Sequence, residues 1–443
     1  MFMPAKSRAV RVGRWALPAS AAAALLVIAL SASASARAGA RVAVVGDTPA
    51  TVHATAIGPV APSTRLALTV VLKSRDASGL AALAAAVSDP ASPSYRHFLS
   101  VGEFAARFGA SSANVRMLRE TLRREGLEPG ALARNDLSIA VSGTAQAASR
   151  AFDVTLRRYR ERSGREVFAN SSAPRVPATL GGVVADVLGL DDTTAAAPEG
   201  LSEITKASGA AAGARGTAAD AGDARASAGS RATAGASAHS ASNAFAGGAG
   251  PVPCPAAASF AASRVGTVNT INQVGDAYRY GGLYADGDFG QGVTVALLEL
   301  EPYASESSDL AAFASCYGIT DASVTDIDVD GGSPASGPLY FSTAETAVDL
   351  ENLLGLAPDV TVNVYYGPND AQGQYDSLGD IIDAPPNQHA QVINNSWGLC
   401  EQNSSAATFR RASVSRNSAA NFTFCCLASV SATSWVARRL LKV

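Results

Sequence analysis

Histidine is scarce in this 443-residue sequence, with four occurrences at positions 53, 97, 239 and 389. A mechanism that needs a cluster of imidazoles therefore has few residues to draw on. An excess of one charge is also missing, because 35 basic side chains are balanced by 38 acidic ones and leave a formal net charge of −3. Without a basic excess, we do not expect nucleic acid as a partner.

No two cysteines have the C-x-x-C spacing, which excludes a zinc ribbon and a thioredoxin-type motif. The five cysteines all lie beyond residue 250, and an odd count leaves at least one of them unpaired. Their presence fits an oxidising compartment. Cys254 with Cys316 is a plausible bridge, although spacing alone does not decide the pairing.

Long apolar runs are absent except at the N-terminus, so a multi-pass membrane protein is excluded. Basic residues there precede an apolar run at residues 15–30, which small residues follow as far as Ala40. This layout is typical of a secretory signal peptide, which we place at residues 1–40. The alternative is an uncleaved anchor helix, because the run nearly reaches spanning length. We expect cleavage, secretion to an extracellular or periplasmic location, and no membrane association afterwards.

Residues 64–192 are predicted to form an α+β domain that is rich in arginine. The sequence pattern predicts strands at 66–72, 137–141 and 154–159, and helices at 79–88, 103–108, 113–125 and 145–152. The order in which they alternate suggests a ferredoxin-like split βαβ arrangement.

Residues 193–253 are dominated by Ala, Gly and Ser, which predicts a flexible linker that proteases can reach. Residues 254–400 form a second predicted domain of α/β type. Strands at 293–300, 324–329, 360–366 and 391–395 alternate there with helices at 309–317, 343–354 and 375–382. This alternation indicates a mostly parallel sheet with both faces covered. Residues 402–443 contain no Asp or Glu, and we treat 401–443 as an aberrant tail.

An acidic motif, STAETAVD at residues 342–349, opens one of these helices. Glu345 and Asp349 are four residues apart and share one face of the helix, where like charges repel. A purely structural interpretation exists, because Ser342 and Glu345 form a capping box and an acid in the first turn suits the helix dipole.

The wider sequence resembles the sedolisins, the serine-carboxyl peptidases that include kumamolisin-like enzymes. In the first domain, DPASPSYRHFL at residues 89–99 and VSGT at 141–144 are similar to the activation prodomain of that family. In the second, ETAVD at 345–349 and INNSWG at 393–398 resemble its acidic helix and substrate-binding edge. The resemblance covers roughly residues 64–400 in order.

The resemblance implies a subtilisin-like α/β peptidase that cleaves polypeptides in acid. A serine would attack the scissile carbonyl, Glu345 would act as general base, and Asp349 would orient it. Paired carboxyls suit this work, because each raises the pKa of the other. Glu299 resembles a further acid that Trp397 links to the pair, although a strand-end charge and a packed aromatic explain those two residues equally well.

The same resemblance assigns the backbone of Ser396, Trp397 and Gly398 to binding of the substrate peptide. It also implies that the prodomain is an intramolecular inhibitor. Its arginines would cover the acidic peptidase face, and acidification would weaken that contact by protonating carboxylates.

Two family features are missing: the G-D-S-G step with the oxyanion aspartate, and the G-T-S-x-x-x-P nucleophile. Ser434 lies in ATS at 432–434 and is rejected as nucleophile, because the glycine, the proline and the distance from Ser396 do not fit. The family's calcium loop is absent too, so we expect no cofactor on this chain and calcium in a full-length relative.

These departures predict an incomplete peptidase domain and a chain that is inactive as written. The simplest explanation is a coding sequence that leaves its frame or is truncated near 401–410, and a natural short paralogue is the alternative. A rival function is a non-catalytic secreted prodomain that inhibits a complete peptidase or serves as its folding chaperone.

Overall fold

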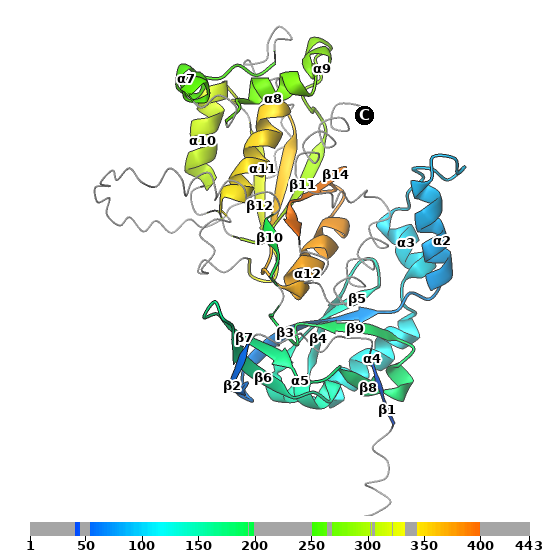
Figure 1. Ribbon diagram of the computed structural model, residues 1–443. Coiled ribbons are helices and arrows are strands. Elements are labelled where there is room, and N and C mark those ends of the chain that lie inside the picture. The colour runs from blue at the N-terminus through cyan, green and yellow to red at the C-terminus, as the bar shows by residue number, and fades with distance from the viewer. Residues whose placement is uncertain are drawn as a thin grey trace, which may run out of the picture.

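The computed structural model describes residues 40–44, 54–193, 195–198, 250–263, 268–301, 303, 306–320, 322–332 and 343–398. These residues form two parts that meet at one helix (Figure 1). Strands β1 to β9 make up the first part, and the parallel sheet with its helices makes up the second. The predicted signal peptide, nearly all of the linker and the tail lie outside the described residues.

A four-stranded antiparallel sheet with the order β4-β5-β3-β9 is the centre of the first part. Its strands are β3 (Arg65–Leu72), β4 (Glu128–Leu132), β5 (Ser138–Thr144) and β9 (Val184–Leu188). Buried and less buried residues alternate along β5, as the two-residue period of a strand requires. An α+β domain is therefore present, and the ferredoxin-like assignment stays a prediction.

Four helices accompany this sheet: α2 (Ala77–Ser88), α3 (Val101–Phe108), α4 (Ser112–Arg124) and α5 (Ala145–Phe152). The predicted helices are confirmed within a few residues at each end. The α3 helix begins with a capping box, in which Ser100 and Glu103 satisfy each other's backbone N–H groups. Along α4, Val115, Leu118 and Leu122 are buried in the core, while the arginines of α4 lie on its other faces.

Two smaller sheets complete the first part. One has the order β2-β6-β7 and consists of Thr55–Pro59, Leu156–Arg160 and Glu166–Asn170. The other pairs β1 (Arg41–Ala43) with β8 (Arg175–Pro177), which the short helix η1 (Ala178–Leu180) follows. Residues that precede position 64 in the sequence therefore contribute strands to the first part.

The second part is built on a parallel sheet with the order β12-β13-β11-β14. Its strands are β11 (Thr294–Glu299), β12 (Ser323–Asp328), β13 (Thr361–Tyr366) and β14 (Val392–Asn395). The strands β11 and β13 are almost wholly buried, which explains their continuous apolar sequence.

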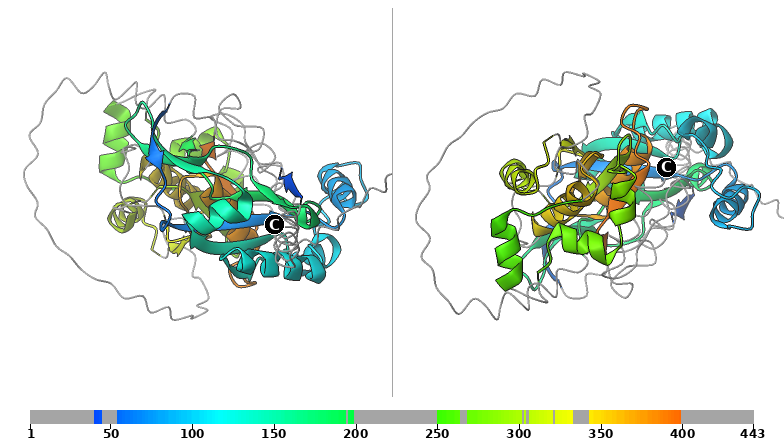
Figure 2. Two further views of the ribbon diagram at one scale, coloured as in Figure 1. Left: turned by 90° about the horizontal axis from the view of Figure 1, so that it is seen from below. Right: turned by 90° about the horizontal axis from the view of Figure 1, so that it is seen from above.

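Helices cover both faces of this sheet, as the alternating pattern predicted (Figure 2). On one face α8 (Ile271–Ala277), α10 (Glu306–Tyr317) and α11 (Thr343–Leu356) pack against Val295 and Leu297. On the other, α12 (Ala371–Ile382) packs against Ala296 and Leu298. The short helices α7 (Pro255–Ser263) and α9 (Gly281–Ala285) lie at the end of the part.

A disulfide joins Cys254, just before α7, to Cys316 in α10, with the two Cα atoms 4.8 Å apart. The pairing that the sequence left open is thereby decided, and it fastens α7 to the helical face of the sheet. Across the described ranges, no helix has both the length and the apolar character needed to cross a membrane.

Candidate active site

The carboxyl end of β11 carries Glu299, a fully buried acid. Two neutral donors hold the same oxygen of its carboxyl group. The indole Nε1 of Trp397 donates to Glu299 Oε2 at 2.9 Å, and the hydroxyl of Thr346 donates to it at 3.0 Å. The predicted link between Glu299 and Trp397 therefore exists as a hydrogen bond.

Burial raises the pKa of Glu299 well above its usual range, and the nearby Asp349 and Glu345 raise it further against the two hydrogen bonds. The second oxygen, Oε1, is buried and has no hydrogen-bond partner among the residues that the structure describes. One oxygen of this carboxyl group accepts two hydrogen bonds and the other accepts none. This arrangement fits the protonated form, in which Oε1 carries the hydrogen.

The two acids of the STAETAVD motif lie on α11, next to Glu299. Glu345 is buried in the first turn, and Asp349 is half-buried one turn later. Ser396 Oγ donates to Asp349 Oδ2 at 2.7 Å, and Asn394 Nδ2 donates to the same oxygen. Burial raises the pKa of Asp349 to about 6, although both hydrogen bonds favour its charged form.

These residues meet because of the parallel sheet. Strands β11 and β14 run side by side in one direction, so Glu299 and the residues after Asn395 reach the same edge. Functional groups collect at the carboxyl ends of the strands in such sheets. The start of α11 arrives at the same place. Glu299, Glu345, Asp349 and Trp397, predicted from separate motifs, thus form one group, which we call the carboxyl site.

Sequence reasoning missed two members of the carboxyl site and part of the role of a third. Thr346 and Asn394 lie inside the quoted motifs, yet no local pattern indicated that their side chains bind Glu299 and Asp349. Ser396 was predicted to act through its backbone. In the structure its hydroxyl binds Asp349 and accepts a hydrogen bond from Asn394 at 3.1 Å.

The predicted substrate edge is the short strand β15 (Trp397–Gly398), directly beside the carboxyl site. It pairs antiparallel with β10 (Ala197–Pro198), which follows the first part in the sequence. Asn369 fastens this segment by donating to the carbonyl of Ala196 at 3.0 Å and accepting from its N–H at 2.8 Å. The edge is therefore paired with an extended segment of the same chain.

Of the four histidines, His97 and His389 lie in the described part of the chain, and both are exposed. Neither belongs to the carboxyl site. Within the described residues, no group of three or more His, Cys, Asp and Glu side chains is placed to hold a metal ion.

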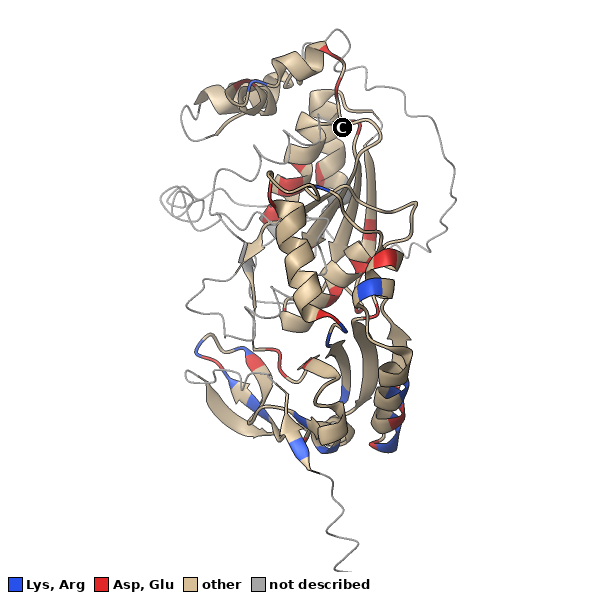
Figure 3. Ribbon diagram, turned by 90° about the vertical axis from the view of Figure 1, so that its right-hand side faces the viewer, with Lys and Arg blue, Asp and Glu red and all other residues tan. Residues whose placement is uncertain are grey.

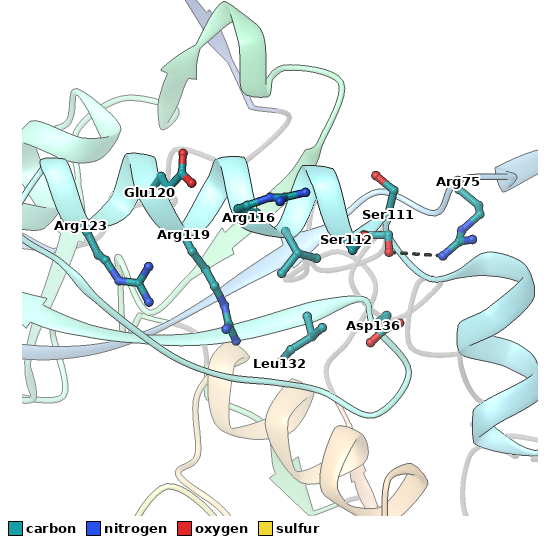
Figure 4. A pocket seen from close by; sticks show the side chains of 11 residues that line it. Arg75, Ser111, Ser112, Arg116, Arg119, Glu120, Arg123, Leu132 and Asp136 are labelled. Carbon is teal, nitrogen blue, oxygen red and sulfur yellow. Dashed lines mark hydrogen bonds between the residues drawn. The ribbon is translucent and has the colours of Figure 1, made fainter.

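A concave surface lies on the first part, along α4, with a volume of about 800 Å³ (Figure 4). Its lining includes Arg75, Arg116, Arg119 and Arg123, together with Glu120 and Asp136. It contains none of the predicted site residues.

The comparisons with known proteins agree with both parts. Residues 53–193 match the family described as "Pro-kumamolisin, activation domain", and residues 331–432 match the "Subtilase family". Together with the sedolisin, xanthomonalisin and kumamolisin similarities given next, these two matches support a sedolisin-family precursor with an activation prodomain.

Three curated relatives accompany these matches. Sedolisin of Pseudomonas sp. (strain 101) is 34% identical over 39% of this chain and 29% of its own length. Xanthomonalisin of Xanthomonas sp. (strain T-22) is 36% identical over 28% of this chain and 15% of its own. Kumamolisin of Bacillus sp. (strain MN-32) is 25% identical over 77% of this chain and 52% of its own. The chain thus matches about half or less of each relative.

A solved structure of Pseudomonas sedolisin, a serine-carboxyl proteinase complexed with two molecules of pseudo-iodotyrostatin, also aligns. It has a TM-score of 0.27 and 21% identity, and it covers 32% of this chain and 40% of that one. So partial an overlap carries no argument about the site.

Proposed function

We propose that this chain is a secreted zymogen form of an acid-acting serine-carboxyl endopeptidase whose substrates are polypeptides. The observation that carries the proposal is the carboxyl site: three acids from β11 and α11 converge beside a strand edge that already holds an extended segment. Similarity to the sedolisin-family peptidases suggests the class of reaction.

In this proposal Glu345 is the general base and Asp349 orients it. Glu299 is protonated and can supply one proton, and the hydrogen bonds from Trp397 and Thr346 hold its carboxyl group in position. The pKa of Asp349, about 6, supports work in acid, because this group changes its charge in that range and not near pH 4. The backbone of β15 would align the substrate as an added antiparallel strand. The backbone of Ser396 would contribute to this edge, while its hydroxyl donates to Asp349.

The first part would be the intramolecular inhibitor. The β10 strand occupies β15 in the antiparallel manner proposed for a substrate, which supports a role of residues 196–198 in blocking the edge. A ferredoxin-like fold of the prodomain is supported by the sheet, in which β3 lies between β5 and β9 and every neighbour is antiparallel. Secretion is supported by the sequence of residues 1–40 and by the disulfide.

We further propose that the 443-residue chain does not cleave peptides as written, because no G-T-S-x-x-x-P or G-D-S-G segment is present in it. The test begins with the gene. Reading its DNA beyond codon 400 in all three frames shows whether those two segments follow. If they do, the frame is restored and the product is assayed on a denatured polypeptide at about pH 4.

The restored chain is expected to cleave, and the 443-residue chain is not. Glu345→Gln in the restored chain should lower kcat by about a thousandfold or more, as loss of a general base does. Glu351→Gln, less than two turns further along α11, is the matched control and should keep the activity. Full activity of Glu345→Gln would contradict the proposed mechanism, and cleavage by the 443-residue chain would contradict its proposed inactivity.

The second candidate is a non-catalytic prodomain that inhibits or chaperones a complete peptidase, and the occupied edge at β15 favours it if no downstream segment is found. The 443-residue protein would then be added to an active sedolisin-type peptidase. Inhibition at stoichiometric amounts, or a higher yield on refolding, supports this function, and the absence of both contradicts it.

A further inference from the structure

Lysine and arginine residues gather on the prodomain, as the blue segments of Figure 3 show. Several of these arginines form ion pairs with carboxylates of the prodomain itself. The pairs are Arg41 with Glu125, Arg65 with Glu128, Arg158 and Arg160 with Glu166, Arg165 with Glu161, and Arg175 with Asp153. The charge of these arginines is therefore balanced within the prodomain.

The concave surface along α4 holds a different set of arginines, and we call it the α4 groove (Figure 4). Arg75, Arg116, Arg119 and Arg123 line it. Among the described residues, none of these four forms an ion pair with a carboxylate. Glu120 also lines the groove, but in Figure 4 its side chain points to the other side of α4 from Arg119 and Arg123. The α4 groove therefore has positive charge that the described part of the chain does not neutralise.

The packing of α4 decides where its arginines lie. Val115, Leu118 and Leu122 bury one side of the helix in the core, which leaves Arg116 and Arg123 exposed. Between positions 116 and 123 the helix rises about 10 Å, at about 1.5 Å per residue. Like charges three and four residues apart repel one another along a helix. This row of arginines therefore lowers the stability of α4 as long as no anion balances it.

Backbone carbonyls hold two of the guanidinium groups in place. Arg75 donates to the carbonyls of Gly109 and Ala110. Nη2 of Arg119 donates to the carbonyl of Gly130 at 2.9 Å, and its Nε is buried without a hydrogen-bond partner among the described residues. A neutral carbonyl orients a guanidinium group without cancelling its charge. Both arginines therefore keep a defined position and an uncompensated charge.

The α4 groove is not the contact with the peptidase part. Along β3, Leu68 and Val70 belong to the core that α4 covers. Thr69, between them, binds Asp376 on α12. Successive strand residues point to opposite faces, so α4 and α12 lie on opposite faces of the sheet. Among the described residues, Arg134 is the prodomain arginine whose hydrogen bonds reach the peptidase part. The arginines of α4 therefore do not form the expected cover over the acidic peptidase face.

The lining of the α4 groove indicates the kind of anion that it fits. Guanidinium groups match carboxylates and phosphates alike. Glu120 and Asp136 also line the groove, together with Ser112 and Leu132. A polyphosphate or a nucleic-acid backbone would bring its charges against these two carboxylates. A polypeptide offers them N–H donors, and it also offers apolar groups to Leu132 and its own acids to the arginines. The mixed lining therefore favours a polypeptide.

The size of the α4 groove fits a short extended segment. An extended peptide advances about 3.3 Å per residue and places every second side chain on the same face. Acids at alternate positions are then about 7 Å apart, so two of them match a row of arginines about 10 Å long. The volume of about 800 Å³ lies within the usual range of ligand-binding clefts, about 300–1,000 Å³.

We propose that the α4 groove is a binding site for an acidic segment of a polypeptide, held in an extended conformation with its carboxylates on Arg116, Arg119 and Arg123. The start of α4, capped by Ser111, adds the positive end of the helix dipole at one end of the groove. The acids of the partner supply the ion pairs that the prodomain itself does not provide. The inference concerns the prodomain surface alone and does not depend on whether the chain cleaves peptides.

The test is a titration of the full chain into a fluorescein-labelled peptide of alternating aspartate and valine, followed by fluorescence anisotropy at pH 7. The peptide should bind at low ionic strength, and added salt should weaken the binding, because the contact is electrostatic. A peptide of alternating asparagine and valine has a similar shape without the charge and should bind at least about tenfold more weakly. No binding of the aspartate peptide, or equal affinity for both peptides, would overturn the proposal.

Two variants of equal net charge make the test specific to the α4 groove. Arg116→Gln/Arg123→Gln removes two exposed guanidinium groups from the groove and should raise the Kd about tenfold or more. Arg157→Gln/Arg162→Gln removes two exposed arginines in and just after β6, and this matched control should change the Kd by less than about twofold. Circular dichroism shows whether both variants are folded. Equal losses of affinity in the two variants would mean general charge attraction and would contradict the site.

A competition experiment separates a polypeptide from a phosphate ligand. Unlabelled aspartate peptide and sodium tripolyphosphate are each added to the complex of the full chain with the labelled peptide. The unlabelled peptide should displace the labelled one at the lower concentration, because the carboxylates in the lining oppose a ligand that offers acceptors alone. Displacement by tripolyphosphate at the lower concentration would overturn the assignment to a polypeptide.

Discussion

Glu299 in the carboxyl site and Asp376 in the domain interface, where α12 lies against β3 of the first part, are both acids that burial deprives of water, yet their surroundings differ. Glu299 receives two hydrogen bonds from neutral donors, and its neighbours belong to the same part of the protein. Asp376 shares its surroundings with a second carboxyl and with a hydroxyl of the other part. Burial within one part makes a proton a fixed component of the fold. Burial between two parts makes the pKa of the acid depend on the contact between them.

Gly189→Ala should have the largest effect, both on the contact of α12 with the first part and on the sheet of the first part itself. Gly189 has φ +85°, and a Cβ atom there would lie 2.2 Å from Oε1 of Gln372 and 2.5 Å from the carbonyl oxygen of Ala67. The strained backbone and the contact with a carbonyl should weaken the interface by about 1–3 kcal/mol or more. Scattering at pH 4 should then show separated parts. Gly164→Ala, also at positive φ but with open space around it, is the control. A compact Gly189→Ala chain at pH 4 would contradict the close approach of α12 to the end of β9.

Trp397→Phe should have the next largest effect, confined to the carboxyl site. It removes a donor from a fully buried carboxyl, which should cost about 1–3 kcal/mol of unfolding free energy in urea. Tyr303→Phe removes a hydroxyl donor from the exposed Asp309 and should cost less than about 0.5 kcal/mol. Equal costs for both variants would mean that burial does not distinguish these bonds.

Glu299→Gln separates the proton from the hydrogen bonds. Because the pKa of Glu299 is raised in the folded state, its contribution to stability is present below pH 4 and is lost as the pH rises. The amide keeps an acceptor for Trp397 and Thr346 but has no charge. The variant should therefore be more stable than the unmodified chain at pH 8, by about 1 kcal/mol or more, and nearly equal to it at pH 4. Urea unfolding at both values is the measurement, and a loss of stability at pH 8 would refute a neutral Glu299.

Ser396→Ala should have the smallest effect of the four. Asp349 is half-buried and keeps its bond from Asn394, so the loss should stay below about 1 kcal/mol. The Ser396 bond favours the charged form, and its removal should move the pKa of Asp349 above about 6. Carboxyl resonances in the NMR spectrum would report this shift. A downward shift would exclude Ser396 as a donor to Asp349.

The sequence predicted the elements well where periodicity is strong. The parallel strands and their helices followed from apolar runs alternating with helical patterns. The grouping of Glu299 with Glu345 and Asp349 was predicted from the family resemblance and not from the strand pattern. The partners Thr346 and Asn394 were missed, because side-chain hydrogen bonds between distant elements leave no local pattern.

The domain interface was beyond sequence reasoning for a similar reason. Thr69 and Asp376 are 307 positions apart, and neither lies in a motif. The excess of arginine in the prodomain suggested an ionic contact, but composition does not say which face a charge occupies. The structure places Arg134 at the interface and the arginines of α4 along a separate concave surface.

A titration of Asp349, in the carboxyl site, and of Asp376, on α12, tests the account of both places most directly. The full chain, labelled with ¹³C at the aspartate carboxyl carbon, would be followed by NMR from pH 3 to pH 9. We predict one resonance that titrates near pH 6 and is absent from Asp349→Asn, and another that titrates near pH 8 and is absent from Asp376→Asn. If every aspartate of the folded chain titrates near pH 4, neither the carboxyl site nor the surroundings of Asp376 are as described.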